Sequence, residues 1–172
     1  MVPSCLGNMS DLINLDLRNN NFHGTIPKFV KCSNLRSLKL AGNQLEGSLP
    51  RSLVNCKKLK ILDVSNEVND IFPHWLVNLP KLRVLLLQSN NFHGSIGNHK
   101  TKFSFPNFRI IDLSHNMFHG QLPSNFFKNL TAMMNGNVEK GKLQHMGDTY
   151  YHDSITIDIK GNYIDVVNIQ LY

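Results

Sequence analysis

Residues 12–27 read LINLDLRNNNFHGTIP, and four later segments of the chain repeat the same pattern. These segments begin at Leu35, Leu59, Leu82 and Phe108, so that successive starts lie 23 to 26 residues apart. The shared pattern is L-x-x-L-x-L-x-x-N-x-L/F-x-G-x-I/L-P. A recurring period of this length indicates one small structural unit that stacks on copies of itself. The sequence therefore predicts a solenoid of five repeats.

The first half of each repeat alternates in the manner of a short β-strand. In Leu15-Asp16-Leu17 the two leucines are expected to point inward and the aspartate outward. Such strands, stacked about 4.8 Å apart, form a parallel sheet. We predict an α/β-type solenoid with this sheet on its concave face, and with loops and short helical turns on its convex side.

Three other positions recur for physical reasons. An asparagine follows each strand, where its amide can both donate to and accept from backbone groups that a bend leaves unpaired. A glycine suits a bend with unusual backbone angles, and a proline fixes φ where the chain enters the convex side. The residues at these positions are Asn20, Asn43, Asn90 and Asn116; Gly24, Gly47, Gly94 and Gly120; and Pro27, Pro50, Pro73 and Pro123.

Some repeats depart from the pattern. Repeat one is one residue short between Pro27 and Leu35, and repeat three is one residue short at Val64-Ser65-Asn66. Repeat four has Gly97 where a proline is expected and runs longer to Phe108. We expect the two shortened repeats to distort the stack locally.

The histidines of NNFHG and NMFHG invite a metal or acid–base interpretation. However, repeat two has Glu46 in the slot that His23, His93 and His119 occupy in other repeats. Imidazole is therefore not required there, and a metal site would need ligands that converge in a fixed geometry. We predict exposed, structurally neutral histidines and no metal site.

The cysteines also recur with the repeat. Cys32 and Cys56 lie 24 residues apart at equivalent convex positions, and Cys5 is assigned to the same position of an incomplete repeat. The odd count and the single cysteine per coil favour small buried apolar side chains over a disulfide framework. Thiol catalysis would need a histidine partner, and the pattern places none.

Composition excludes several classes of function. The formal charge is +6 and the pI is near 9.3, but Lys and Arg look scattered, with the densest group at Lys57, Lys58 and Lys60. No nucleic-acid-binding motif occurs, so a nucleic-acid partner is not expected. The chain has neither a signal peptide pattern nor an apolar run of membrane-spanning length. Without a nucleophile–base constellation or a phosphate-binding loop, we predict no enzyme activity and no cofactor.

The periodicity ends after Leu130. Residues 131–148 are polar and lack leucine phasing, which indicates a loop. From Ile155 the apolar residues alternate on both sides of Gly161, which is typical of a hairpin, or of the lead-in to another coil. We divide the chain into residues 1–11, the tail of an incomplete repeat; residues 12–131, the five repeats; and residues 132–172, a segment that is not part of the repeats, with a lead-in to further repeats as the alternative.

The pattern is identified as a leucine-rich repeat of the 24-residue plant type. The runs NDIFPHWLVNLPKLRVLLLQSNNFHG, FPNFRIIDLSHNMFHGQLPSNFFKNLTAM and YYHDSITIDIKG resemble the plant leucine-rich-repeat receptor-like proteins, the class that contains the tomato leaf-mould resistance receptors. By this resemblance, the chain is a fragment holding late repeats and the start of the island region that interrupts them.

The resemblance implies an extracellular ligand-recognition region of a cell-surface receptor-like protein in defence or developmental signalling. Its ligand would be a peptide, a protein or a cell-wall-derived fragment, bound without catalysis, and receptor kinases would act as co-receptors. The location implied is the extracellular side of the cell membrane, although this chain itself carries neither signal peptide nor transmembrane helix. The alternatives are a secreted leucine-rich-repeat inhibitor of microbial wall-degrading enzymes and a non-functional truncated receptor remnant.

Extended concave surfaces of repeat proteins bind proteins and peptides, so the outward strand positions are the candidate binding residues. Two tyrosines near the alternating segment are added to them, and two N-x-S/T sequons are candidate glycosylation sites. The ligand-binding candidates are Asp16, Arg18, Lys39, Asp63, Leu86, Gln88, Asp112, Ser114, Tyr150 and Tyr151, and the glycosylation candidates are Asn8 and Asn129.

Overall fold

The computed structural model describes residues 1–97, 107–122, 128–134, 144–145, 154–159, 162–167 and 170–171. The chain forms two compact units, residues 1–132 and residues 133–172. Within the described residues, no helix is both long enough and apolar enough to cross a membrane.

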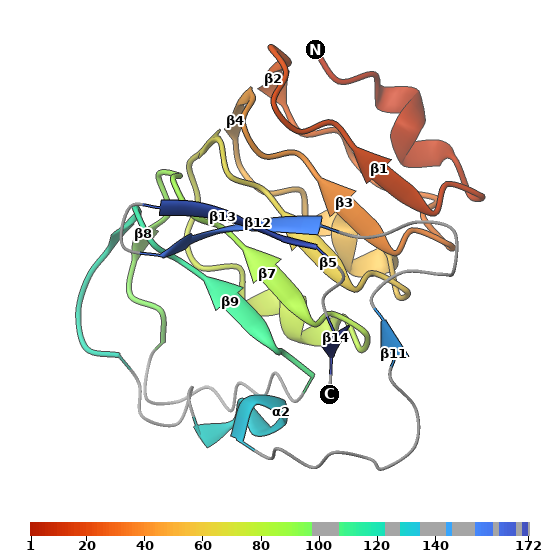
Figure 1. The fold of residues 1–172 in the computed structure, drawn as a ribbon. Helices are drawn as coiled ribbons and strands as arrows, with labels where there is room; N and C mark the ends of the chain where they lie inside the picture. Colours follow the sequence, from red (N-terminus) through yellow and green to blue (C-terminus); the bar gives the residue numbers. More distant parts are fainter. Residues whose placement is uncertain are drawn as a thin grey trace. The chain divides into compact units, whose positions relative to one another are not determined.

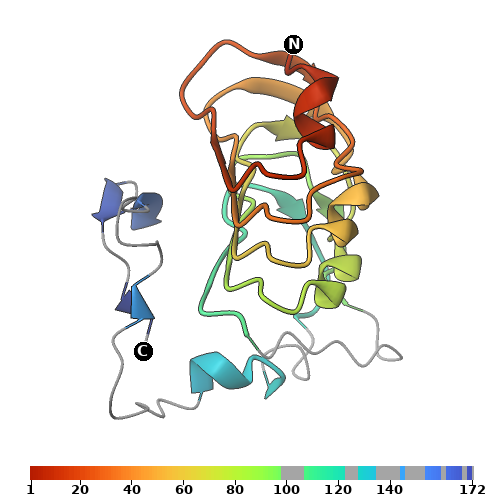
Figure 2. The same cartoon turned by 90° about the vertical axis from the view of Figure 1, so that its right-hand side faces the viewer.

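The first unit is a stack of coils built on a five-stranded parallel sheet with the order β1-β3-β5-β7-β9 (Figures 1 and 2). Each strand begins two residues after the first leucine, or phenylalanine, of its repeat. Pairing is in register, so that Leu15, Leu38, Leu62, Leu85 and Ile111 form one column. The strands are β1 (Asn14–Asp16), β3 (Ser37–Lys39), β5 (Ile61–Asp63), β7 (Val84–Leu86) and β9 (Ile110–Asp112).

Shorter strands pair beyond the turn that follows the concave strands. One parallel sheet has the order β2-β4-β6 and another pairs β8 with β10, and a single bridge joins Ile71 to His93. The second half of each repeat is therefore also stacked in register. These strands are β2 (His23–Thr25), β4 (Gln44–Gly47), β6 (Glu67–Val68), β8 (His93–Gly94) and β10 (Met117–Phe118).

The convex side carries the short helical turns that the sequence predicts. They are the 3₁₀ helices η1 (Ser4–Asn8), η2 (Arg51–Asn55) and η3 (His74–Asn78), each preceded by a proline. Proline suits this place because its fixed φ starts the turn and no backbone donor is lost from it. Together, the parallel concave sheet and the convex turns confirm the predicted fold class.

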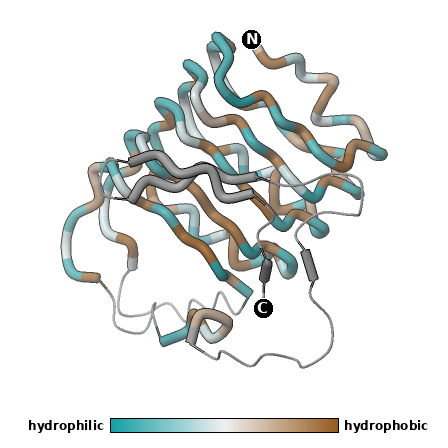
Figure 3. Tube along the Cα trace, in the orientation of Figure 1, coloured by the Kyte–Doolittle hydropathy of each residue, from teal (hydrophilic) through white to brown (hydrophobic). Residues whose placement is uncertain are grey.

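The core lies between the concave sheet and the convex turns. The column residues Leu38, Leu62 and Leu85 are completely buried, and truncating such a leucine to alanine ordinarily costs about 2–5 kcal/mol. Phenylalanines add to the core near the flank strands; for example, Phe92 and Phe118 stack with ring centroids 6.2 Å apart. Along the chain trace, apolar residues concentrate on the strands and polar residues on the turns (Figure 3).

A ladder of asparagine side chains closes the turn after each concave strand. Asn43 donates to Leu40 O and, one coil away, to Leu17 O, both at 2.9 Å. Its side-chain oxygen accepts Phe22 N at 3.1 Å. Asn116 repeats this arrangement with Leu87 O, Leu113 O and Phe92 N. Each amide thus satisfies backbone groups of two coils, as the sequence predicts.

The turn of repeat three is shorter but keeps its place in this ladder. In full-length turns the residue before the asparagine has positive φ, at Asn19, Gly42, Ser89 and His115. Repeat three omits that residue. Asn66 still donates to Leu40 O at 3.0 Å and accepts Asn43 N at 2.9 Å. The expected distortion is therefore confined to the turn, because β5 remains in register with β3 and β7.

The convex segment of repeat one differs from the others, because residues 27–35 form no helical turn. Hydrogen bonds to both neighbouring coils hold it instead. Val30 N and Lys31 N donate to Gly7 O at 2.9 and 3.1 Å, and Phe29 N donates to the Ser52 hydroxyl at 2.9 Å. A Cβ at Gly7 would lie 1.9 Å from Lys28 O, so this close approach requires glycine.

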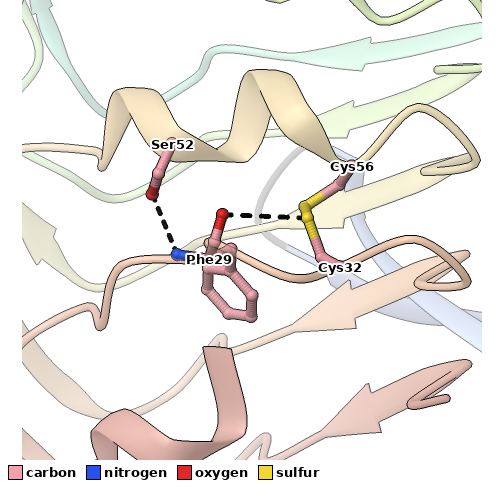
Figure 4. The surroundings of a disulfide bond; sticks show 4 residues. All are labelled: Phe29, Cys32, Ser52 and Cys56. Carbon is pink, nitrogen blue, oxygen red and sulfur yellow. Dashed lines mark hydrogen bonds between the residues drawn. A yellow bond between two sulfur atoms is a disulfide. The ribbon is translucent and has the colours of Figure 1, made fainter. Parts of the chain in front are cut away.

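A disulfide joins Cys32 to Cys56 in this region (Figure 4). The prediction of free, buried thiols at these two positions was wrong. Stacking of equivalent slots brings the two Cα atoms to 5.0 Å, which lies within the ordinary range for a disulfide. The two cysteines are 24 residues apart in the sequence, which is one repeat, so stacking of neighbouring coils brings them together. The prediction did not take this stacking into account.

Cys5 is free and exposed, so its assignment to the same buried slot was also wrong. Counted back from Leu12 as from Leu59, Cys5 matches Ser52 of repeat two, and Met9 matches Cys56. Cys5 lies in η1. The prediction misplaced it because the repeat tail lacks the preceding strand that would fix its phase.

In the second unit, the described residues form antiparallel pairs. Strands β12 (Ser154–Ile159) and β13 (Asn162–Val167) form the hairpin that the alternation predicts, with Ile157 opposite Ile164. Strand β11 (Gln144–His145) pairs with β14 (Gln170–Leu171). The helix α2 (Thr131–Met134) lies where the first unit ends and the second begins.

Candidate functional site

The candidate binding residues form rows across the concave sheet, because the strands pair in register. The middle row is Asp16, Lys39, Asp63, Leu86 and Asp112. A second row lies two residues further along each strand, just past its end. This second row is Arg18, Ala41, Ser65, Gln88 and Ser114.

The expectation that all these side chains face solvent is wrong for the inner strands. Lys39, Asp63 and Leu86 are 1%, 2% and 0% exposed, and Gln88 is also buried. Asp16 and Ser114, by contrast, are exposed. The candidates that keep exposed surface, Asp16, Arg18, Asp112 and Ser114, belong to the coils of the two edge strands, β1 and β9. The accessible candidates are therefore at the two edges of the sheet.

The β1 edge carries a charged group. The guanidinium of Arg18 forms an ion pair with the Asp16 carboxylate at 2.8 Å, and its Nε donates to the same carboxylate at 2.9 Å. Burial tends to raise the pKa of Asp16, but the hydrogen bonds and charge of Arg18, with a smaller effect from Lys39, hold it below its usual value. Asp16 is thus an anion held in a fixed orientation.

Asp63, two strands away, has a different environment. Burial raises the pKa of its carboxyl to about 6, although Arg18, Lys39 and a hydrogen bond from Ser65 oppose the shift. The Ser65 hydroxyl donates to Asp63 Oδ1 at 3.3 Å. Desolvation outweighs these partners because the side chain is almost completely removed from water. The middle row thus alternates acid, base and acid before it reaches Leu86.

The β9 edge repeats the acid–hydroxyl pairing in a more accessible form. Asp112 Oδ1 accepts Ser114 N at 2.9 Å and the Ser114 hydroxyl at 2.7 Å. Between the charged edge and this one lie apolar positions of β5 and β7, namely Ile61, Val84 and Leu86. The concave face therefore carries accessible polar groups at both edges, and between them buried apolar side chains lie beside the buried Lys39 and Asp63, an arrangement suited to ligand binding.

The histidines of the repeat signature are exposed, as predicted: His23, His93 and His119 lie on the flank beyond the turns. Within the described residues, no group of three or more His, Cys, Asp or Glu side chains is placed to hold a metal ion. His74 differs from the signature histidines because it is partly buried, and burial lowers its pKa.

The remaining candidates have no described binding geometry. Asn8, at the end of η1, is exposed, and Asn129 is half-exposed, so glycosylation at both stays a prediction. Tyr150 and Tyr151 lie outside the described residues.

The sequence reasoning missed a row of cations. Arg36, Lys60, Arg83 and Arg109 directly precede β3, β5, β7 and β9. The signal was available, because each follows the first leucine or phenylalanine of its repeat. The prediction considered only the alternating positions within the strands and therefore left out the residue before each strand. It also treated the Lys and Arg residues as scattered along the chain.

Comparison with known proteins agrees with this geometry. The family model described as leucine rich repeat matches residues 33–92, and a second model of the same description matches residues 11–32 and 107–129. The chain belongs to the leucine-rich repeat family. Receptor-like protein 33 of Arabidopsis thaliana is 46% identical over 87 residues, which are 49% of this chain and 10% of that protein. The chain thus spans about a tenth of the length of that relative.

Two solved structures extend the comparison to leucine-rich repeat receptors. The structure of PEPR1-AtPEP1 is 29% identical with a TM-score of 0.68, and covers 77% of this chain and 18% of its own. The structure of the Arabidopsis receptor kinase HAESA, in complex with the peptide hormone IDA and the co-receptor SERK1, is 27% identical with a TM-score of 0.65. It covers 71% of this chain and 20% of its own. The resemblance to plant leucine-rich-repeat receptor-like proteins is confirmed.

Proposed function

We propose that this chain is the ligand-recognition region of a plant cell-surface receptor-like protein, and that it binds a peptide or protein on its concave face without catalysis. The observation that carries the proposal is the in-register continuation of the candidate rows across all five strands. A surface with one row of side chains per coil suits an extended ligand that runs along the stack.

The two edges of the sheet supply the polar contacts in this proposal. Arg18 and Asp16 offer a guanidinium and a carboxylate whose orientation the ion pair already fixes. At the other edge, Asp112 and Ser114 offer an acceptor and a hydroxyl. Groups held in place before binding lose less conformational entropy when the ligand arrives.

Two buried polar atoms of the face support the proposal further. Ser37 Oγ and Gln88 Oε1 have no hydrogen-bond partner within the part of the chain that the structure describes. Buried polar atoms in proteins ordinarily have partners. A ligand that reached these atoms as the strand side chains rearranged would satisfy them.

The proposed location, signalling role and co-receptors are based on the similar proteins. A structural neighbour was solved with a peptide hormone and a co-receptor, and the matched relative is named a receptor-like protein. We accordingly place the chain on the extracellular side of the cell membrane, in defence or developmental signalling, with receptor kinases as co-receptors. The island region would be residues 132–172.

The proposal is tested by selecting peptides from a random library on the immobilised wild-type chain. Their affinities are then measured for two edge variants, Asp16→Ala/Arg18→Ala and Asp112→Ala/Ser114→Ala. The matched control is Glu46→Ala/Lys28→Ala, which also removes one acid and one base but lies off the concave face. We expect an edge variant to weaken binding about tenfold, equivalent to about 1.4 kcal/mol. Equal affinities for the edge variants and the control would contradict concave binding.

A further inference from the structure

The cations that precede the concave strands form a continuous ladder along the stack. The backbone N–H of Lys60 donates to Arg36 O at 2.8 Å, that of Arg83 to Lys60 O at 2.9 Å, and that of Arg109 to Arg83 O at 2.8 Å. Backbone pairing thus places one basic side chain per coil, at a spacing of about 4.8 Å. All of these side chains are partly exposed.

Three exposed lysines widen the ladder on its convex side: Lys57, Lys58 and Lys81. The contacts that fix two of them are to neutral oxygens. Lys57 Nζ donates to Asn78 O at 3.1 Å, and Lys58 Nζ donates to Asn34 Oδ1 at 2.7 Å. Such contacts orient the ammonium groups without neutralising their charge. We call Arg36, Lys57, Lys58, Lys60, Lys81 and Arg83 the basic rim.

Acidic residues are segregated from the basic rim. Residues 28–38, 51–62 and 74–87, which run from the convex turn into the strand, contain no Asp or Glu. The carboxylates of repeats one to three lie at the end of the concave strand or in the segment that follows it. Residues 1–132 carry 15 Lys and Arg against 7 Asp and Glu. Among the residues of the first unit, this side of coils two to four is therefore basic, whereas Asp11 precedes the first strand of coil one. Charges of one sign on one surface reinforce each other's field.

We propose that the basic rim binds a linear acidic polysaccharide that carries one carboxylate per sugar ring, with the polymer running across coils two to four. The two arginines of the basic rim, Arg36 and Arg83, suit carboxylate, since a guanidinium can donate two parallel hydrogen bonds to it. Lysines around it contribute further charge at long range, which attracts a polymer more than a single anion.

The spacing of the cations favours this class of polymer. One pyranose ring is comparable in length to the distance between neighbouring strands, so the repeat of the polymer is close to that of the coils. Single-stranded nucleic acids are ordinarily held by stacking on aromatic side chains, and the basic rim has none.

This inference is independent of the proposed concave site, because the basic rim contains none of its accessible residues. Loss of peptide binding in the edge variants would leave the basic rim untouched. Loss of polysaccharide binding in rim variants would likewise leave the peptide proposal intact.

The test measures binding of oligogalacturonate to the full chain, with the fully methyl-esterified oligomer and polyglutamate as comparison probes. The rim variant is Lys57→Gln/Lys58→Gln/Lys81→Gln, in which all three positions are exposed. The matched control is Lys28→Gln/Arg51→Gln/Lys128→Gln, which removes the same charge from three exposed positions outside the rim. Thermal melting of each variant checks that the fold is kept.

We expect oligogalacturonate to bind the wild-type chain, to bind more weakly as salt is added, and to bind the rim variant about tenfold more weakly. The control variant is expected to change affinity by less than about twofold, and an Arg83→Gln variant to lie between the two. Absence of binding, equal losses in the rim and control variants, or equal binding of the methyl ester would overturn the proposal. Equal or tighter binding of polyglutamate would also overturn it, in favour of an acidic protein partner.

Discussion

Repeats one and three are each one residue short, but the chain accommodates the two deletions in different ways. In repeat three the deletion removes the left-handed residue of the turn, while Asn66 keeps its hydrogen bonds to neighbouring coils. In repeat one the convex segment loses its helical turn, and the disulfide, Gly7 O and the Ser52 hydroxyl hold it.

The difference teaches which parts of the repeat are interchangeable. In each turn, one asparagine side chain bonds to backbone groups of neighbouring coils. Loss of a residue from the turn therefore changes the course of the backbone but keeps these hydrogen bonds. Convex geometry has no such repeated side chain, so repeat one depends on contacts that occur once in the described residues. In both cases the concave strands remain in register, and the candidate binding rows therefore stay continuous.

The largest effect is expected from the asparagine ladder. Asn90 is buried, accepts Asn66 N and Val68 N, and donates to Leu87 O. An Asn90→Ala change leaves several buried backbone groups without partners, and we expect it to cost about 4 kcal/mol. Asn66→Ala, in the short turn, is expected to cost about 2 kcal/mol. Urea unfolding measures both, and a larger loss for Asn66→Ala would reverse the ranking of the two turns.

Removing the disulfide tests how the convex segment of repeat one is held in place. The bridge closes a separation of 24 residues, for which constraint of the unfolded chain predicts about 3 kcal/mol of stabilisation. We expect a Cys32→Ala/Cys56→Ala variant to lose about that much stability in urea. Peptide mapping under non-reducing conditions should recover the Cys32–Cys56 linkage from the wild type. If the variant were as stable as the wild type, the hydrogen bonds of Phe29, Val30 and Lys31 alone would hold the segment.

Asp63 lies in the strand before the short turn, and its titration tests whether this part of the sheet stays closed to water. Because the folded state raises the pKa of Asp63 to about 6, protonated Asp63 favours folding fully below pH 3.8, and this contribution is lost as pH rises through about 6. An Asp63→Asn variant should therefore gain stability relative to wild type between pH 4 and pH 7, by up to about 3 kcal/mol. Urea melts across this range measure the gain. A constant difference across the range would contradict the buried carboxyl.

The smallest effect is expected from the signature histidines. His93 and His119 are exposed on the flank, and exposed substitutions generally change stability by less than about 0.5 kcal/mol. A His93→Gln/His119→Gln variant should have the same melting temperature as the wild type at neutral pH. A clear loss would show that these imidazoles support the flank strands.

The sequence was sufficient for the parts of the fold that recur. Leu15, Leu38 and Leu62 could be placed in one column, and the roles of Asn43 and Gly47 followed from the chemistry of amides and glycine. The disulfide could not be found in that way, because it depends on the distance between Cys32 and Cys56 after stacking. Burial of Lys39 and Leu86 was missed for a similar reason, since alternation gives the direction of a side chain but not what surrounds it. The cation ladder from Arg36 to Arg109 was readable, but only once the slot before the strand was compared across repeats.

The central claim is that different local contacts stabilise the two short repeats while the concave strands stay in register. Hydrogen–deuterium exchange with and without reductant tests this claim most directly. Reduction of Cys32–Cys56 should raise exchange at the Phe29, Val30 and Lys31 amides. The amides of β3 and β5, and those of Asn66 and Val68, should remain protected. Equal acceleration in the convex segment and the strands would contradict the account, because the disulfide would then support the whole stack and not one shortened coil.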